Sequence, residues 1–152
     1  MKMLLILIPF LFQIQGCKDV SAISLAPAME YEILHEFEYN EYANPTSKNA
    51  IIIRNQVDYE NELITRTSEA VKAVNFEEEL IVLIDMGTRN TGGYSLNVTF
   101  SESDNYVRAN VVFTFPGEGC VVTNALVNPF KLIKLGTTKY VLVTEEITFT
   151  SC

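Results

Sequence analysis

Short apolar runs separated by turn-forming residues recur along most of this chain, and this pattern constrains its fold more than any other feature. Several runs alternate apolar and polar residues with the two-residue period of a half-buried strand. The predicted strands cover residues 29–39, 50–53, 80–86, 94–100, 106–115, 130–135 and 140–149. The polar residues 101–105 separate two alternating runs, and we therefore expect a hairpin there.

One segment departs from this pattern and predicts a helix. Between residues 58 and 73 the apolar side chains recur at helical spacing, and Asp58 fits the N-cap position. About seven strands and one helix predict an α+β fold that is mainly antiparallel β, a small sheet or sandwich with one packed helix. The length of 152 residues favours a single β-rich domain, which we place over residues 29–152.

The N-terminal segment has the layout of a secretory signal. Lys2 precedes an apolar run over residues 3–12 that is too short to act as a membrane anchor. The run leads to Ile14-Gln15-Gly16-Cys17, which resembles a bacterial lipobox with an acylated cysteine. We expect a lipoprotein signal peptide over residues 1–16, a lipidated Cys17, a tether over residues 17–28, and a protein held at the cell envelope outside the cytoplasm. An ordinary cleaved signal with a chance cysteine is the alternative.

The remaining cysteines bear on redox state and on metal binding. With Cys17 assigned to lipid, Cys120 and Cys152 remain, and an oxidising compartment would permit them to pair. Two unpaired thiols are the alternative. No Cys/His cluster with metal-ligand spacing is left, so we expect neither a metal nor another cofactor.

Charge and residue types argue against two broad functions. The formal net charge of −8 disfavours nucleic-acid binding, because an acidic surface repels phosphates. The single histidine, His35, lies on the apolar face of the first strand, and we expect a core residue with satisfied nitrogens. Glu145 and Glu146 are adjacent on a strand and point to opposite faces, so they cannot form an acid–base pair. We expect no enzymatic activity.

Two glycine-rich segments carry an unusual density of special residues. The first is Gly87-Thr88-Arg89-Asn90-Thr91-Gly92-Gly93-Tyr94, and the second is Pro116-Gly117-Glu118-Gly119-Cys120, followed by residues 121–130. Their glycines permit positive φ and close approach of another backbone. Tyr94 and Phe130 are candidates for aromatic anchors on a partner protein. By residue type alone the same segments are ordinary strand connections.

The order and spacing of these motifs resemble the C-terminal domain family of the protease complex subunit PrcB. That family shows an apolar strand, G-x-x-x-T-G-G-Y, a hairpin, P-G-x-G-C, and T-x-A-L-x-x-P-[YF] before a final strand. The matching residues are Gly87, Thr91, Gly92, Gly93, Tyr94, Pro116, Gly117, Gly119, Cys120, Thr123, Ala125, Leu126, Pro129 and Phe130. The resemblance is strong over residues 76–135 and looser from about residue 29 onward.

The resemblance implies a binding role. The family's namesake is a lipoprotein that helps a surface protease complex to form or remain stable, so this chain would be a non-catalytic protein-interaction module. Its partner would be another envelope protein, with a secreted protease as the first candidate. The expected binding residues are Thr91, Gly92, Gly93, Tyr94, Pro116, Gly117, Gly119, Pro129 and Phe130. The same loops resemble those of chagasin-like cysteine-protease inhibitors, and a direct inhibitor or a purely structural lipoprotein are the alternatives.

Overall fold

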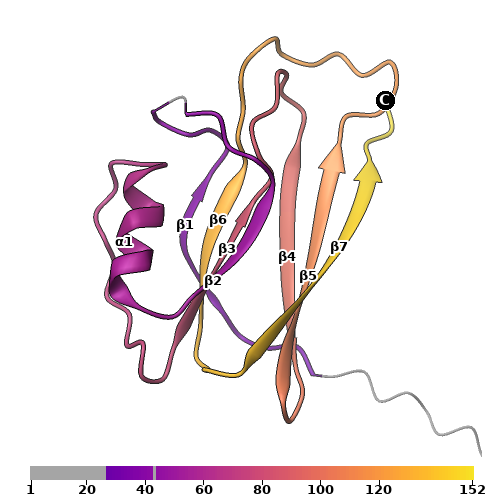
Figure 1. Ribbon diagram of the computed structural model, residues 1–152. Helices are drawn as coiled ribbons and strands as arrows, with labels where there is room; N and C mark the ends of the chain where they lie inside the picture. Colours follow the sequence, from indigo (N-terminus) through magenta and orange to yellow (C-terminus); the bar gives the residue numbers. More distant parts are fainter. Residues whose placement is uncertain (1–26, 43) are drawn as a thin grey trace, which may run out of the picture.

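The computed structural model describes residues 27–42 and 44–152, which form seven strands and one helix (Figure 1). In chain order these are β1 (Glu32–Phe37), β2 (Asn49–Ile53), α1 (Gln56–Ile64), β3 (Leu80–Asp85), β4 (Ser95–Glu102), β5 (Tyr106–Phe115), β6 (Phe130–Leu135) and β7 (Tyr140–Phe149). The predicted fold class is confirmed. The predicted signal peptide, Cys17 and residues 17–26 of the tether lie outside the described residues. Within the described part, no helix is long and apolar enough to cross a membrane.

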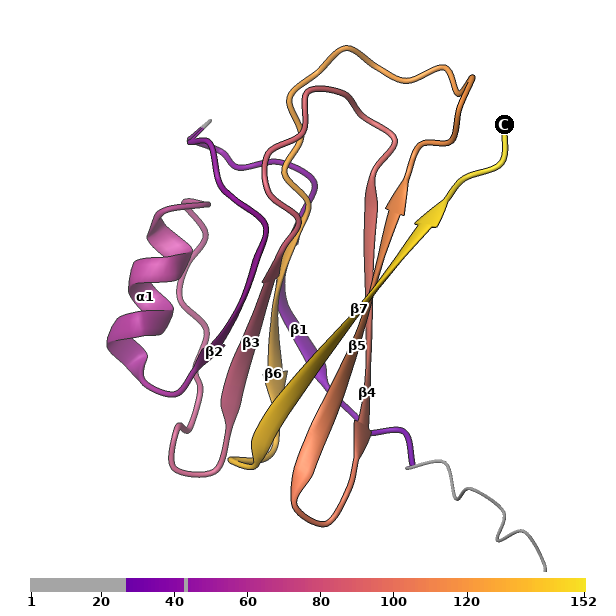
Figure 2. The ribbon, with the colours of Figure 1, turned by 45° about the vertical axis from the view of Figure 1, so that its right-hand side comes forward.

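The strands form two sheets that pack face to face, and α1 covers the outer face of the first sheet (Figures 1 and 2). The first sheet has the order β1-β6-β3-β2 and is antiparallel throughout. The second has the order β4-β5-β7, with β5 and β7 parallel. That parallel pair arises because the chain leaves β5, crosses to β6 in the first sheet, and then returns to the second sheet as β7.

Two apolar cores hold the three layers together. Between the sheets, Val82, Ile84 and Ile133 of the first sheet pack in one cluster with Val98 and Phe113 of the second. On the opposite face of the first sheet, a second cluster joins that sheet to Tyr59 and Leu63 of α1. All six residues of β3 are buried, which explains why this strand is a continuous apolar run without alternation.

The helix is shorter than the sequence pattern predicts. Asn55 is its N-cap, and the Asn55 side chain accepts a hydrogen bond from the backbone N–H of Asp58 at 2.9 Å. Asp58 therefore lies in the first turn. The helix ends at Ile64 because Arg66 turns inward, where it is 4 % exposed and its Nη1 donates to the Glu62 carbonyl at 2.8 Å. Residues 65–73 of the predicted helix are instead irregular.

The predicted alternation over residues 29–39 is also interrupted. A register shift between Ile33 and His35 places both Leu34 and His35 in the interior. Ile33, expected on the apolar face, is 38 % exposed. An irregularity of this kind moves the following side chains to the other face, which a strict two-residue period cannot anticipate.

The expectation for His35 is confirmed. The residue is 2 % exposed, and both ring nitrogens have partners. Nδ1 lies 2.6 Å from a Glu69 carboxylate oxygen, and Nε2 lies 2.8 Å from the Tyr59 hydroxyl. These contacts join β1 to α1 and to the segment that follows α1.

Candidate functional site

The motif-bearing segments all lie at one end of the sandwich, which we call the loop end (Figures 1 and 2). It comprises residues 38–42 and 44–48, 86–94, 116–129 and 150–152, while the β4–β5 and β6–β7 turns lie at the opposite end. Residues 86–94 and 116–129 run side by side. Arg89 and Val127 form an antiparallel bridge, and the backbone N–H of Gly92 donates to the carbonyl of Thr123 at 2.9 Å. Three motifs that are separate in the sequence therefore lie together at one end of the sandwich.

The glycines of these motifs allow the two loops to pack against each other. A Cβ atom on Gly92 would collide with the Thr123 side chain, and one on Gly117 would collide with the Thr150 carbonyl. Gly93 has a φ of +86°, and a Cβ there would lie 2.9 Å from Val122 Cγ1. Gly119 alone among these four has open space around it. We expected these glycines to let a partner approach the backbone closely. At Gly92, Gly93 and Gly117, the atoms that lie close belong to this chain.

Phe130 does not have the accessible position that we expected of an aromatic anchor. It begins β6 and is fully buried, with its ring stacked on Phe37 at a centroid distance of 5.4 Å. The guanidinium of Arg66 lies 5.9 Å from the same ring centroid. Pro129 and Gly92 are buried as well. The expectation for Phe130 is corrected accordingly: this residue is part of the core beneath the loops.

Tyr94 belongs to an aromatic cluster at the surface of the loop end. Its ring packs edge-on against Phe115 at 5.2 Å, and Phe115 packs against Phe149 at 6.0 Å. The Arg89 guanidinium lies 5.6 Å from the Tyr94 centroid and 5.2 Å from that of Phe115. We call these four residues the aromatic–arginine cluster. Phe149 is 66 % exposed, so part of the cluster is open to solvent.

Arginine and aromatic side chains are the types that carry most binding energy in protein interfaces. Arg89 is held in place because its Nη2 donates to the Met86 carbonyl at 2.8 Å. Its buried Nε has no hydrogen-bond partner among the described residues. Sequence reasoning did not single out Arg89 or Phe149, because their proximity to Tyr94 comes from the packing of three separate strand ends.

A buried polar network supports the loop end from below. Asp85 is fully buried at the end of β3 and accepts hydrogen bonds from Arg66 Nε at 3.1 Å, Asn128 Nδ2 at 2.6 Å and the Gly87 N–H at 2.7 Å. Arg66 also pairs with Glu62 at 2.6 Å. Buried charges need such partners because they have lost their hydration. The network fixes both motif-bearing segments relative to β3 and α1. In the sequence, the only indication of this network is Asp85, a carboxylate at the end of an otherwise apolar run.

A carboxylate also ties the segment after β1 to the segment after α1. Glu41 accepts hydrogen bonds from the Ser68 N–H at 2.6 Å and the Thr67 hydroxyl at 2.9 Å. The Ser68 bonds are the main cause that lowers the pKa of Glu41, with a smaller contribution from Thr67. The carboxylate is therefore kept ionised and continues to accept these bonds.

A small cleft of about 170 Å³ opens at the loop end. Tyr39, Asn44, Thr88, Leu126 and Val127 contribute to its walls. Tyr39 is 56 % exposed and Leu126 is 64 % exposed, so apolar surface borders the opening. The cleft is smaller than the roughly 300–1,000 Å³ typical of small-molecule pockets, and its size suits a single side chain of a partner.

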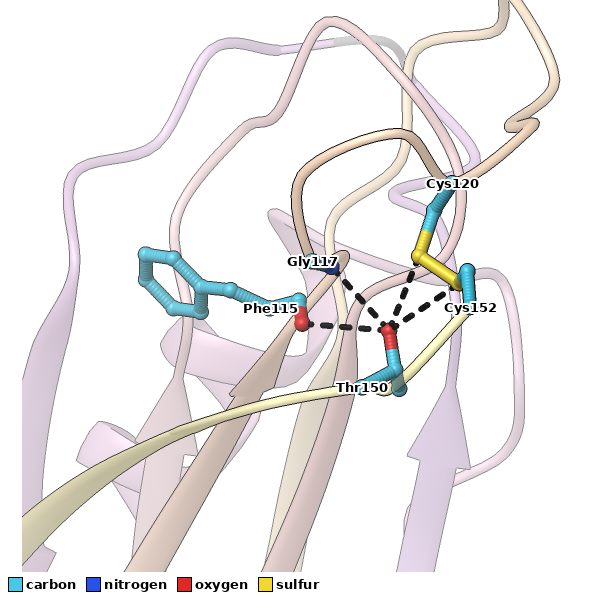
Figure 3. The surroundings of a disulfide bond; sticks show 5 residues. All are labelled: Phe115, Gly117, Cys120, Thr150 and Cys152. Carbon is cyan, nitrogen blue, oxygen red and sulfur yellow. Dashed lines mark hydrogen bonds between the residues drawn. A yellow bond between two sulfur atoms is a disulfide. The ribbon is translucent and has the colours of Figure 1, made fainter.

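A disulfide between Cys120 and Cys152 ties the second motif to the end of β7 (Figure 3). Their Cα atoms are 5.2 Å apart. Beside the bridge, the Thr150 hydroxyl accepts from the Gly117 N–H at 3.1 Å and donates to the Phe115 carbonyl at 3.4 Å. Of the two states that the sequence left open, the structure has the bridged one. The bridge restrains residues 116–129 at the loop end.

No cluster of His, Cys, Asp or Glu within residues 27–42 and 44–152 has the arrangement of a metal site. The loop end offers packing and hydrogen-bonding groups in the aromatic–arginine cluster, the cleft and the exposed backbone around Gly119.

Comparison with known protein families agrees with the motifs. Residues 80–136 match the family model described as PrcB C-terminal. This segment runs from the start of β3 to the residue after β6 and contains both motif-bearing loops. Comparisons with curated proteins and with solved structures found no match. The resemblance carried by the motifs is confirmed: residues 80–136 of this chain are similar to the PrcB C-terminal family.

Proposed function

We propose that this chain is a non-catalytic, lipid-anchored subunit that binds an exported protease, or another member of its complex, at the cell envelope. The similarity of residues 80–136 to the PrcB C-terminal family supports association with a protease complex. The proposed contribution is to assembly or stability of that complex, made through the loop end.

The preassembled state of the loop end is the observation that carries this proposal. Its two motif-bearing segments are joined by backbone hydrogen bonds and by packing at Gly92 and Gly93, and the Cys120–Cys152 disulfide ties the second segment to the residues after β7. A surface that is already ordered loses little conformational entropy on binding, so more of the contact energy remains as affinity. Tyr94, Arg89 and Phe149 would supply the main contacts, with Thr91, Pro116 and Gly119 beside them.

The position of the N-terminal end indicates which end of the sandwich the proposed lipid anchor would hold. Ala28 pairs with Ser101, and the Glu102 N–H donates to the Pro27 carbonyl, at the end of the sandwich opposite the loop end (Figure 1). An acyl group on Cys17 would therefore tether that opposite end. The loop end would then face away from the membrane, toward other exported proteins.

Affinity capture from the source cells tests the binding role. We expect Tyr94→Ala and Arg89→Ala each to lose a protease-complex partner that the unchanged protein captures. Tyr106→Ala is the matched control, because Tyr106 is a partly exposed aromatic residue at the start of β5, at the opposite end. Circular dichroism should first establish that each variant is folded.

Equal capture by all folded variants would contradict a role for the loop end. Loss of thermal stability without loss of the partner would favour a purely structural protein. Inhibition of a papain-like or serine protease by the purified chain would favour the inhibitor instead. Radiolabelled palmitate incorporation that is lost in Cys17→Ser tests the lipid anchor separately.

A further inference from the structure

Three of the four sheet edges in this sandwich are protected from pairing with another strand. β1 is short and irregular, and its Glu36 and Glu32 pair with Lys131 and Lys134 at 2.7 and 2.8 Å. β2 has only five residues. Part of the β4 edge is covered by residues 27–29, with the Met29 N–H donating to the Phe100 carbonyl at 2.9 Å. Short length, irregular register, charges and covering segments are the known means of blocking sheet edges.

The edge formed by β7 is long and regular, no described segment covers it, and its charged residues are Glu145 and Glu146. Its ten residues pair with β5 in unbroken register from Tyr140 to Phe149, and within the described residues no strand pairs on its other side. Its apolar side chains are unusually exposed, with values of 67 % for Tyr140, 52 % for Ile147 and 66 % for Phe149. A long, regular edge strand with exposed apolar residues can pair with a strand of another chain unless a helix or loop covers it.

The hydrogen-bonding groups of this edge can be assigned from one contact. The Thr150 N–H donates to the Phe115 carbonyl of β5, so the backbone of Thr150 faces the sheet interior. Successive residues of a strand direct their backbone groups to opposite sides. The N–H and C=O groups of Val141, Val143, Glu145, Ile147 and Phe149 therefore point to the open side.

The upper half of β7 also offers apolar contact area. β5 and β7 have ten residues each, whereas β3 and β6 have six, and β7 diverges from the first sheet toward the loop end (Figures 1 and 2). Ile147 and Phe149 lie on the same face of β7 as the core residue Val141, yet they are exposed because no strand of the first sheet lies opposite them. An incoming strand would bury them as it pairs.

Charge indicates which kind of strand fits. Glu145 pairs with Lys48, whereas Glu146 is exposed and has no ion pair among the described residues. The whole chain carries a formal charge of −8, which disfavours pairing with a second copy of the chain. A two-fold pairing centred on Glu145 would also place two carboxylates opposite each other.

We propose that the open edge of β7 binds an extended segment of a partner protein that carries Lys or Arg opposite Glu146 and apolar residues on either side. This inference deepens the proposed function and rests on it, since it names how a partner is bound.

A titration of the full mature chain with synthetic peptides tests this inference. The probe is a capped ten-residue peptide of alternating Val and Thr with two Lys at its centre, and the controls are the same peptide with two Glu and a Lys peptide N-methylated at alternate residues. We expect the Lys peptide alone to slow amide exchange at Val141, Val143, Glu145, Ile147 and Phe149 by tenfold or more, as followed by NMR.

A charge exchange makes the test specific. Glu146→Lys should transfer the preference from the Lys peptide to the Glu peptide, whereas Glu118→Lys, an equal charge change at an exposed loop position, should not. No protection by the Lys peptide at millimolar concentration would overturn the inference, and so would protection by a concentration-dependent dimer of the chain. If Tyr94→Ala abolishes partner capture while Glu146→Lys does not, the proposed function stands and the inference about β7 fails.

Discussion

At the scale of single residues, the loop end depends on buried groups more than on exposed ones. Asp85 and Arg66 place two paired charges in the interior, and Asp85 also accepts hydrogen bonds from Asn128 and Gly87. Gly92 and Phe130, which the sequence motifs predicted as binding residues, pack inside the protein. The residues that fix the loops and those that can meet a partner are therefore largely different.

Removal of the Asp85 charge should destabilise the fold strongly. Asp85→Asn leaves the Arg66 guanidinium buried with only Glu62 as an ion-pair partner. We expect a loss of about 3–5 kcal/mol in the free energy of unfolding, measured by urea denaturation. Asp104→Asn is the matched control, because Asp104 is exposed in the β4–β5 turn and should change stability by less than about 0.5 kcal/mol.

Phe130 and Tyr94 should respond differently to truncation. Phe130→Ala removes a fully buried ring, and we expect a cost of about 3–5 kcal/mol in the free energy of unfolding. Tyr94→Ala removes a half-buried ring and should cost about 1–2 kcal/mol. The two chemical-denaturation midpoints provide the comparison, and an equal loss for both variants would refute the burial assigned to Phe130.

At the scale of elements, the strands could be predicted from the sequence, while the ends of α1 and the irregularity in β1 could not. The strands have local signals, namely apolar alternation and turn residues at their ends. The helix ends where Arg66 reaches Asp85, a contact with a residue 19 positions later in the chain. Long-range packing also determines the burial of Phe130 and brings Arg89, Tyr94 and Phe149 together. No local sequence pattern predicts these two features.

The disulfide should order one element in particular. Reduction of Cys120–Cys152 releases residues 116–129 from the end of β7. We expect faster amide exchange in this segment together with a loss of about 2–5 kcal/mol in global stability. Cys120→Ser with Cys152→Ser should reproduce both effects without a reductant. Unchanged exchange in residues 116–129 would show that backbone contacts alone hold the loop.

At the scale of the whole molecule, the sandwich separates the N-terminal end of the described chain from the motif-bearing loops. The chain enters beside the β4–β5 turn, and the family motifs gather at the other end (Figure 1). If Cys17 is lipidated as we propose, the domain would present the loop end away from the membrane. The binding residues predicted from the sequence lie together at one end of the molecule, and the packing leaves only some of them exposed.

Site-specific photo-crosslinking in the source cells tests this central claim most directly. A photoreactive amino acid would replace an exposed residue of the loop end, Val121, Leu126 or Glu118, or an exposed residue of the opposite end, Asp104 or Gly136. The account predicts crosslinks to one exported protein from the loop-end positions and none from the opposite end. Crosslinks to that protein with equal yield from Asp104 and Gly136, or from these positions alone, would contradict it.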